Sequence, residues 1–258
     1  MPNPYSLTVV IVAKNEERNI AECIASALFA DEVLVLDSSS SDATVHLAQT
    51  SGARVVETVW PGYGPQVARG FSLASSEWVL SLDADERIST ALRDEVLAAI
   101  RSGAHDGWRI PRLSEFCGRF IHHGGWRPDY TLRLGRRAKS GFTEHFLHAH
   151  MTVDGSIGQL KQSIIHFSYP NMHDVLEKLD RYSSGHARDM RTDGKTGSVF
   201  KAVTHGLTAF LRTYVVRLGF LDGQHGLMLA IYNAEYTYYK YIKLTFLERP
   251  ATRPEYRR

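Results

Sequence analysis

Two carboxylates spaced two residues apart, Asp83 and Asp85, follow the apolar run Trp78–Leu82 and are followed in turn by Glu86. Hard divalent cations prefer carboxylate oxygens as ligands. A cation held in this way can neutralise the negative charge that builds on a departing phosphate group. One carboxylate of such a pair can bind the metal while the other reaches a ribose hydroxyl. An isolated Asp-x-Asp is also common on solvated loops, so the surrounding elements must decide between the two interpretations.

The elements around this pair alternate between buried strands and helices. Mostly apolar runs predict strands at residues 7–13, 32–36 and 78–82, and a short strand is expected at 54–57. Helical periodicity predicts helices at 16–28, 42–51 and 66–75. Strands that alternate with helices at this spacing favour a parallel sheet with helices on both faces. The sequence thus predicts an α/β protein with a Rossmann-like, doubly wound, mostly parallel sheet.

Polar residues follow each predicted strand. They occur at Lys14–Glu16, at Asp37–Asp42, after Glu57 and at Asp83–Glu86. Parallel α/β sheets bind ligands beyond the carboxyl ends of their strands. All four segments would lie along that one edge, which favours a ligand-binding role for the carboxylates over a solvated loop.

The pattern changes after the first hundred residues. Residues 107–166 form shorter segments rich in His, Gly and Arg, which predict mixed or antiparallel strands and loops that close the site. Asn171 is suited to cap a helix that follows it, and two further helices are expected at residues 199–218 and 224–247. The predicted domains are residues 1–168, which bind the ligand, and residues 169–258, a C-terminal helical appendage that associates with a membrane or oligomerises.

Composition excludes several classes of protein. The chain of 258 residues is 43% hydrophobic and 22% charged, which is ordinary for a soluble globular protein. Its two cysteines, Cys23 and Cys117, imply no disulfide framework. We see no signal peptide, and no apolar run approaches the roughly 20 residues that span a bilayer.

The net charge of +2 conceals an uneven distribution. From Lys195 to the end of the chain there are ten lysines and arginines and four acids, a balance of +6, so the rest of the chain carries −4. Aromatic residues between Phe210 and Phe246 are interleaved with these bases, which suits contact with an anionic membrane surface. The same aromatics can equally form the core of the helical appendage. No nucleic-acid reader motif is present, so we expect no nucleic-acid partner.

Three segments, at residues 10–17, 35–44 and 78–86, resemble in content and order the signatures of family 2 inverting glycosyltransferases. They read Val-Ile-Val-Ala-Lys-Asn-Glu-Glu, Val-Leu-Asp-Ser-Ser-Ser-Ser-Asp-Ala-Thr and Trp-Val-Leu-Ser-Leu-Asp-Ala-Asp-Glu. The resemblance extends through Gly125–Tyr130 and Phe220–Gly223, and covers nearly the whole chain. It is closest to the branch of lipopolysaccharide-core β-1,4-glucosyltransferases.

This resemblance implies a GT-A fold, a UDP-sugar donor and a Mg²⁺ or Mn²⁺ ion. By position, Asp37 resembles the acid that recognises the uracil ring, Asp83 the acid on the ribose side and Asp85 the metal ligand. Glu16 resembles a residue near the nucleoside. These four acids are the predicted donor site.

The chain departs from the pattern of its relatives at two places. Val67 and Ala68 stand where relatives tend to have a basic residue and Asn, and Arg69 can take over donor binding if the helix is rotated. Ala149 stands where relatives commonly carry Glu, which Ala cannot replace.

An inverting transfer needs a base that takes the proton of the acceptor hydroxyl. Asp129 is the first candidate for this catalytic base and Glu144 the second. A salt bridge from Asp129 to Arg133, four residues further on, explains Asp129 equally well.

Two further sets of residues are candidates for ligand contacts. We expect diphosphate or an anionic acceptor at the arginines of the middle segment, Arg127, Arg133, Arg136 and Arg137. The histidines at positions 145, 148 and 150 lack the additional convergent ligands of a zinc site and are expected to make ordinary hydrogen bonds or acceptor contacts.

The sequence therefore predicts an enzyme, a metal-dependent hexosyltransferase that moves a hexose, with glucose favoured, from UDP to a heptose of a lipopolysaccharide core. Its expected place is cytoplasmic and peripheral, on the inner face of a bacterial inner membrane, as a monomer or an oligomer. Transfer to a polyprenyl phosphate is one alternative, because that acceptor is already ionised and needs no base. A nucleotide-sugar-binding protein that has lost turnover is the other, suggested by Val67, Ala68 and Ala149.

Overall fold

The computed structural model describes residues 3–143 and 150–247. The protein divides into two compact units. The first, the α/β unit, contains the chain up to Leu113 together with Pro128–Phe167, and the second, the helical unit, contains Ser114–Arg127 and the chain from Ser168 onward. The segment Ser114–Arg127, which the predicted boundary assigns to the first domain, thus belongs to the second unit.

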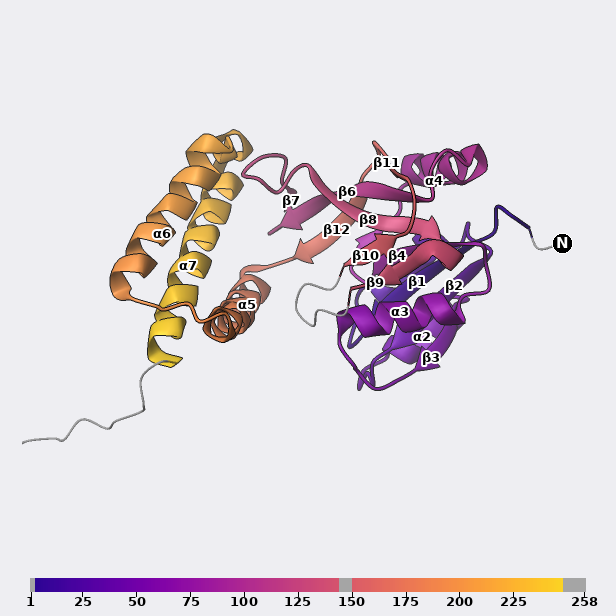
Figure 1. Cartoon of the computed structure of the whole chain (residues 1–258), viewed down its shortest axis with the longest axis horizontal. Coiled ribbons are helices and arrows are strands. Elements are labelled where there is room, and N and C mark those ends of the chain that lie inside the picture. Colours follow the sequence, from indigo (N-terminus) through magenta and orange to yellow (C-terminus); the bar gives the residue numbers. More distant parts are fainter. Residues whose placement is uncertain (1–2, 144–149, 248–258) are drawn as a thin grey trace, which may run out of the picture. The chain divides into compact units, whose positions relative to one another are not determined.

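The α/β unit is built on a mixed sheet, shown in Figure 1. One half is parallel and has the order β3-β2-β1-β4, with bounds β1 (Leu7–Ala13), β2 (Glu32–Asp37), β3 (Arg54–Glu57) and β4 (Trp78–Asp83). The other half continues in the order β8 (Asp129–Arg136), β6 (Gly107–Phe116), β12 (Ile164–Tyr169) and β5 (Glu86–Arg87). Strand β8 runs antiparallel to both β4 and β6. The predicted Rossmann-like parallel half and its mixed extension are confirmed.

Short elements complete this unit. Strand β11 (Ile157–Gln159) pairs parallel with β6, and β9 (Ser140–Phe142) pairs antiparallel with β10 (Met151–Val153). A 3-10 turn at Arg137–Lys139 precedes β9. The four helices are α1 (Ile20–Ala27), α2 (Thr44–Thr50), α3 (Tyr63–Leu73) and α4 (Thr90–Ser102).

Both faces of the parallel half are covered by apolar side chains. Because successive residues of a strand point to opposite faces, β1 contributes Val9 and Ile11 to one core cluster and Val10 to the other. Helices α1, α2 and α4 pack in the first cluster, and α3 packs in the second with β9 and β10. The central strands β1, β2 and β4 are therefore mostly apolar, which is why they could be located from the sequence, and polar residues follow at the sheet edge.

Helix α3 begins three residues before the start predicted at residue 66, at Tyr63. Gly62 precedes it with a φ of 110°, a conformation that favours glycine. The earlier start adds a turn to the helix and brings the Tyr63 side chain to the end of β4, where it contacts Asp83.

The helical unit contains α5 (Met172–Thr192), α6 (Val199–Leu211) and α7 (Gly223–Leu247), and the short strand β7 (Arg119–Phe120). The side chain of Asn171 accepts a hydrogen bond from the backbone N–H of Asp174, as a helix cap does. Where one helix is predicted at 199–218, α6 ends at Leu211. A π-helical turn, Arg212–Val216, and then a 3-10 turn, Gly219–Asp222, follow it. Within residues 3–143 and 150–247, no helix is both long and apolar enough to cross a bilayer.

Asp222, in the Phe220–Gly223 segment noted in the sequence, has a structural role in the helical unit. Its buried carboxylate accepts hydrogen bonds from the backbone N–H groups of His122 and His123, at 3.1 and 2.7 Å. It also lies 3.2 Å from Nδ1 of His123. One carboxylate therefore fixes the turn before Trp126.

Two glycines test the packing of the two units. A Cβ on Gly70 of α3 would lie 2.3 Å from Cγ1 of Val10 in β1, whereas a Cβ on Gly185 of α5 would meet no atom within 4 Å. We expect Gly70→Ala to destabilise the protein by about 1–3 kcal/mol through overpacking. Gly185→Ala should stabilise α5 by about 0.5–1 kcal/mol, because alanine is the better helix former. Thermal and urea unfolding followed by circular dichroism measures both, and equal effects of the two changes would contradict the described packing.

Candidate functional site

The carboxyl ends of β1 and β2 are joined by hydrogen bonds between their loops. The backbone N–H of Asn15 donates to Oγ of Ser40 at 2.8 Å, and Oδ1 of Asn15 accepts from the N–H of Ser41 at 2.9 Å. Asn15 and Ser39 both have positive φ angles, 55° and 60°. Non-glycine residues with such angles are uncommon and often lie at functional sites.

The same crosslinking places Glu16, predicted to lie near the nucleoside. Its backbone N–H donates to Oγ1 of Thr44 at 2.7 Å, and its carboxylate accepts from the side-chain amide of Asn19 at 2.9 Å. Asp42 accepts a hydrogen bond from the backbone N–H of Thr44 at 3.0 Å, beside Ala43, which occupies the N-cap position of α2. The loops after β1 and β2 thus form one connected rim.

Asp37, the predicted uracil acid, lies at the end of β2 and is fully buried. Its two carboxylate oxygens accept hydrogen bonds from the backbone N–H and the hydroxyl of Ser40, at 2.9 and 2.5 Å. Asp37 therefore shapes the Ser38–Ser41 turn, and any contact with a base requires that turn to open. Gln66 supports the same turn, since its amide donates to Oγ of Ser38 at 3.1 Å.

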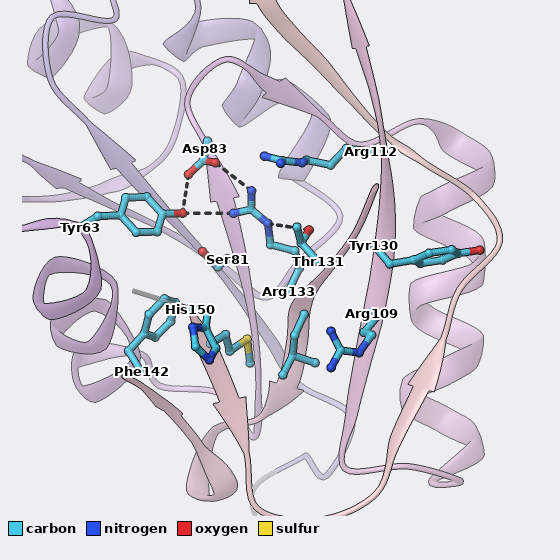
Figure 2. A pocket seen from close by; sticks show the side chains of 12 residues that line it. Tyr63, Ser81, Asp83, Arg109, Arg112, Tyr130, Thr131, Arg133, Phe142 and His150 are labelled. Carbon is cyan, nitrogen blue, oxygen red and sulfur yellow. Dashed lines mark hydrogen bonds and ion pairs between the residues drawn. The ribbon is translucent and has the colours of Figure 1, made fainter. Parts of the chain in front are cut away.

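The end of β4 carries a network of paired charges, of which Figure 2 shows Asp83, Tyr63 and Arg133. Nη2 of Arg133, from β8, donates to Oδ2 of Asp83 at 2.8 Å and to Oε1 of Glu86 at 2.9 Å. Tyr63 donates its hydroxyl proton to Oδ1 of Asp83 at 2.7 Å. Oε2 of Glu86 in turn accepts from the backbone N–H of Asp83 at 2.9 Å. The turn that bears Asp85 is therefore held at both ends.

The charges of this network depend on burial and on Arg133. Burial alone would raise the pKa of Asp83, but the Arg133 guanidinium and the Arg133 and Tyr63 hydrogen bonds outweigh it and lower the pKa to about 2. Burial raises the pKa of Glu86, with Arg133 opposing the rise and Asp83 adding to it. Burial and the nearby Asp83 also raise the pKa of Tyr63, so Tyr63 remains a hydrogen-bond donor.

Asp85, the predicted metal ligand, lies beside a histidine that the sequence interpretation did not include. Oδ2 of Asp85 is 3.4 Å from Nε2 of His166 on β12, and both side chains are partly exposed. The backbone N–H of Phe167 donates to the carbonyl of Asp85 at 2.9 Å, which fixes β12 beside this turn. A carboxylate oxygen and an imidazole nitrogen this close are suitable ligands for one divalent cation.

Asp129, the first candidate for the catalytic base, pairs with Arg112 rather than with Arg133. Both hydrogen bonds from Arg112 go to Oδ2 of Asp129, at 2.8 and 2.5 Å. The predicted salt bridge to Arg133 is wrong, because four residues along a strand span about 13 Å. The pairing of β6 with β8 instead sets Arg112 opposite Asp129. Oδ1 of Asp129 accepts no hydrogen bond within the described part of the chain, and 40% of the side chain is exposed.

A pocket of about 400 Å³ adjoins Asp83 (Figure 2). Tyr63 and Asp83 line it together with Arg109 and Arg112 of β6 and Tyr130 and Arg133 of β8. Phe142 of β9, Met151 of β10 and the adjacent His150 complete this part of the lining. This volume falls in the range of small-molecule sites. Arg109 is exposed and makes no ion pair with any acid that the structure describes.

Other predicted ligands lie elsewhere. Arg69 is exposed on α3 and does not line this pocket. Arg136 pairs with Glu77 and Asp106, and Nε of Arg137 donates to the carbonyl of Ser76. Glu144, His145, His148 and Ala149 lie outside the described residues.

Three residues of the site were missed by the sequence interpretation: Tyr63, Arg112 and His166. Tyr63 was missed because the start of α3 was predicted too late. Arg112 and His166 come from strands β6 and β12, whose neighbours depend on sheet pairing between segments far apart in the chain. The sequence did offer one signal for His166, since this histidine stands within the largely apolar segment Ile164–Tyr169, which forms a strand.

This fold is also found in proteins of known structure. The fold is that of GT-A glycosyltransferases: the chain superimposes on the structure of S. aureus TarS 1–349 in complex with UDP-GlcNAc with a TM-score of 0.50 and 19% sequence identity, over 66% of this chain and 60% of that chain. The protein is a glycosyltransferase and belongs to glycosyl transferase family 2, whose model matches residues 8–153.

Relatives of similar length support this assignment. The chain is 30% identical over 242 residues to the lipopolysaccharide core biosynthesis glycosyltransferase LpsC of Rhizobium meliloti, which covers 90% of this chain and 89% of LpsC. It is also 30% identical over 241 residues to an uncharacterized glycosyltransferase of Rickettsia prowazekii, covering 87% of this chain and 82% of the relative.

Replacing Arg133, which carries the positive charge of the buried network, should lower the stability of the fold by an amount that depends on pH. We expect Arg133→Met to lower the free energy of unfolding by about 3–5 kcal/mol at neutral pH, because it leaves Asp83 and Glu86 buried without their counter-charge. The raised pKa of Glu86 rises further without Arg133. A carboxyl group with a raised pKa stabilises the fold below its unfolded value, near 4.5, and loses that contribution as the pH rises through its folded pKa. The deficit should therefore grow from about pH 4.5 towards neutrality.

Arg109→Met is the matched control, since Arg109 lines the same pocket but is exposed. It should change the unfolding free energy by no more than about 0.5 kcal/mol. Urea unfolding at several pH values measures both variants. A pH-independent deficit for Arg133→Met would contradict the described network.

Proposed function

We propose that the protein transfers a hexose, with glucose favoured, from UDP to a heptose of a lipopolysaccharide-core acceptor, with inversion at the anomeric carbon. The observation that carries this proposal is the juxtaposition at the end of β4: Asp83 is held by Arg133 and Tyr63 and lines a pocket with them, and Asp85, two residues further on, lies beside His166. The printed activity of LpsC, lipopolysaccharide core biosynthesis, supports the acceptor class.

The donor is proposed to bind along the edge formed by the ends of β1, β2 and β4. Glu16 and the Asp37 turn would contact the nucleoside, and Asp83 the ribose, since each Asp83 oxygen keeps a lone pair beyond its one hydrogen bond. The superimposed TarS structure contains UDP-GlcNAc, which supports a UDP-sugar for this fold. Arg69 is a weaker candidate for this role because it lies outside the pocket lining.

Asp85 and His166 are proposed to hold the divalent cation. An imidazole ligand beside a carboxylate favours Mn²⁺ over Mg²⁺, because Mg²⁺ selects oxygen ligands more strictly. When bound, the ion would supply positive charge that offsets the negative charge developing on the UDP diphosphate.

The chain's own part in the transfer is to move a proton. The acceptor hydroxyl oxygen forms a bond to the anomeric carbon while the bond from that carbon to the diphosphate breaks, and its electron pair leaves with UDP. The hydroxyl proton passes to a carboxylate. Asp129 suits this step because Arg112 occupies only Oδ2 and thereby orients Oδ1. Glu144 remains the second candidate.

The arginines of the pocket favour a second acceptor class. Arg109 and Arg112 line the pocket, and two guanidinium groups suit a phosphate. A polyprenyl phosphate would also dispense with the base, since the phosphate oxygen is already ionised. A donor-binding protein without turnover is the third candidate and would bind UDP-sugars without forming product.

Either acceptor is anchored in a lipid. We therefore propose that the protein acts at the inner face of the bacterial inner membrane, on the side where UDP-sugars are made, as a peripheral protein.

Turnover with two acceptors separates these candidates. With Mn²⁺ and UDP-glucose, a heptose-terminated core lipopolysaccharide should be glucosylated, and Asp129→Asn should lower kcat by at least about 100-fold with little change in the KM for donor. Asp94→Asn is the control, because Asp94 is exposed on α4 and pairs with the adjacent Arg93. Product is measured by mass spectrometry and the new linkage by NMR.

Each alternative gives a distinct result in this assay. Glucosylation of polyprenyl phosphate, with Asp129→Asn as active as wild type, would identify the phosphate acceptor and contradict the heptose assignment. A loss of activity in Glu144→Gln but not in Asp129→Asn would move the base to Glu144. Calorimetric UDP-glucose binding without any product would identify a binding protein.

A further inference from the structure

Helix α6 of the helical unit exposes a continuous row of aliphatic and aromatic side chains. Phe200, Val203, Leu207 and Leu211 follow the spacing of one helix face and are all exposed, Phe200 at 77% and Leu207 at 60%. The opposite face of α6 buries only small residues, Ala202 and Gly206. These four larger apolar side chains are therefore left mostly exposed to solvent.

The row continues beyond α6 and onto α7. Val215 and Val216 in the π-helical turn are exposed, Val216 at 74%. Helices α6 and α7 lie side by side, as Figure 1 shows, and an open groove between them is lined by Val203 and Leu207 together with Ile231 and Tyr239 of α7. We call this surface, from Phe200 to Val216 with Ile231 and Tyr239, the α6–α7 apolar face.

Bases outnumber acids around this face. Residues 199–221 contain three bases, Lys201, Arg212 and Arg217, and no acid. Over residues 195–247 there are six bases and two acids, a balance of +4; one acid, Asp222, is buried, and the other, Glu235, is exposed and lines the groove between α6 and α7. An exposed apolar row bordered by bases is the pattern of helices that lie in the interface of anionic bilayers.

The structure changes which residues carry this pattern. The sequence pointed to the aromatic residues between Phe210 and Phe246, but Tyr232 among them is buried and shares a hydrogen bond with Tyr169 at 2.9 Å. Tyr236 contacts His186, and Tyr241 stacks on His205. These aromatics mostly pack between helices, and the exposed face is largely aliphatic.

We propose that the α6–α7 apolar face binds the surface of an anionic phospholipid bilayer, with Phe200, Leu207 and Val216 inserted among the lipids and Arg212 at the headgroups. Isolated exposed apolar residues are ordinary on proteins, but a contiguous row bordered by bases is not. The inference rests on the proposed function in one respect: a lipid-anchored acceptor gives the protein a reason to bind a membrane.

A second copy of the chain is the competing occupant. Two such faces would bring like charges together, which disfavours association. A bilayer with acidic headgroups instead complements the bases, with each exposed Lys or Arg strengthening the binding by roughly fivefold.

The test is co-sedimentation of the full chain with sucrose-loaded vesicles that contain no acceptor. We expect binding to vesicles of phosphatidylcholine mixed with phosphatidylglycerol and at least about tenfold weaker binding to phosphatidylcholine alone. Leu207→Glu should weaken binding to the anionic vesicles by at least about tenfold, because it removes an inserted side chain and adds a repelled charge. Arg212→Gln should weaken it by about fivefold.

Leu28→Glu is the matched control, since Leu28 is a leucine at the end of α1 in the α/β unit and is 55% exposed. It should leave vesicle binding unchanged, and all variants should retain wild-type circular dichroism and calorimetric UDP affinity. Equal loss in Leu28→Glu and Leu207→Glu, or no preference for anionic vesicles, would overturn the proposal. So would a dimer that Leu207→Glu dissociates in light scattering without any vesicle binding, which would identify a second copy as the occupant. Because the vesicles contain no acceptor, this test is independent of turnover. Vesicle binding can fail while the enzyme is active, and it can succeed while the enzyme is inactive.

Discussion

The site depends on the interaction of Arg133 with Asp83 and Glu86. Arg133 is almost fully buried, and one of its nitrogens reaches both carboxylates at 2.8 and 2.9 Å. A buried cation of this kind is costly unless its partners satisfy it, and removal of either side leaves an uncompensated charge. The pair therefore locks β8 to the turn after β4. That turn also carries Asp85, so the position of the proposed metal ligand follows from a salt bridge formed by its neighbours.

The same network separates two roles among acids that are adjacent in sequence. Asp83 and Glu86 are engaged by Arg133, Tyr63 and a backbone N–H. Asp85, between them, remains partly exposed and next to His166. Two acids thus give the turn its shape, and the one between them is left for a ligand. Arg112 plays a comparable part for the proposed base Asp129 by holding one of its carboxylate oxygens.

The parallel half of the sheet could be predicted from the sequence because its strands are buried on both faces. Runs such as Leu7–Ala13 are apolar except for Thr8, and that signal is local. The acids at the strand ends could be located for the same reason. His166 and Arg112 could not, since their neighbours are set by the pairing of β12 and β6, which joins residues far apart in the chain. The Asp129–Arg133 bridge failed because a four-residue spacing suits a helix, whereas Asp129 begins a strand. The role of the C-terminal aromatic residues could not be decided from the sequence, because aromatic residues occur both in helical cores and at membrane interfaces, and only their burial separates the two.

The central claim is that Asp85 joins a divalent cation to the UDP moiety of a sugar donor. Calorimetric titration of UDP into the protein with saturating Mn²⁺, and again with the metal chelated, measures this directly. We expect chelation to weaken UDP binding to wild type by at least about tenfold, and Asp85→Asn to bind UDP as weakly with Mn²⁺ as without it. Asp94→Asn should keep the full Mn²⁺ dependence. Mn²⁺-dependent UDP binding that is unchanged in Asp85→Asn would contradict the account.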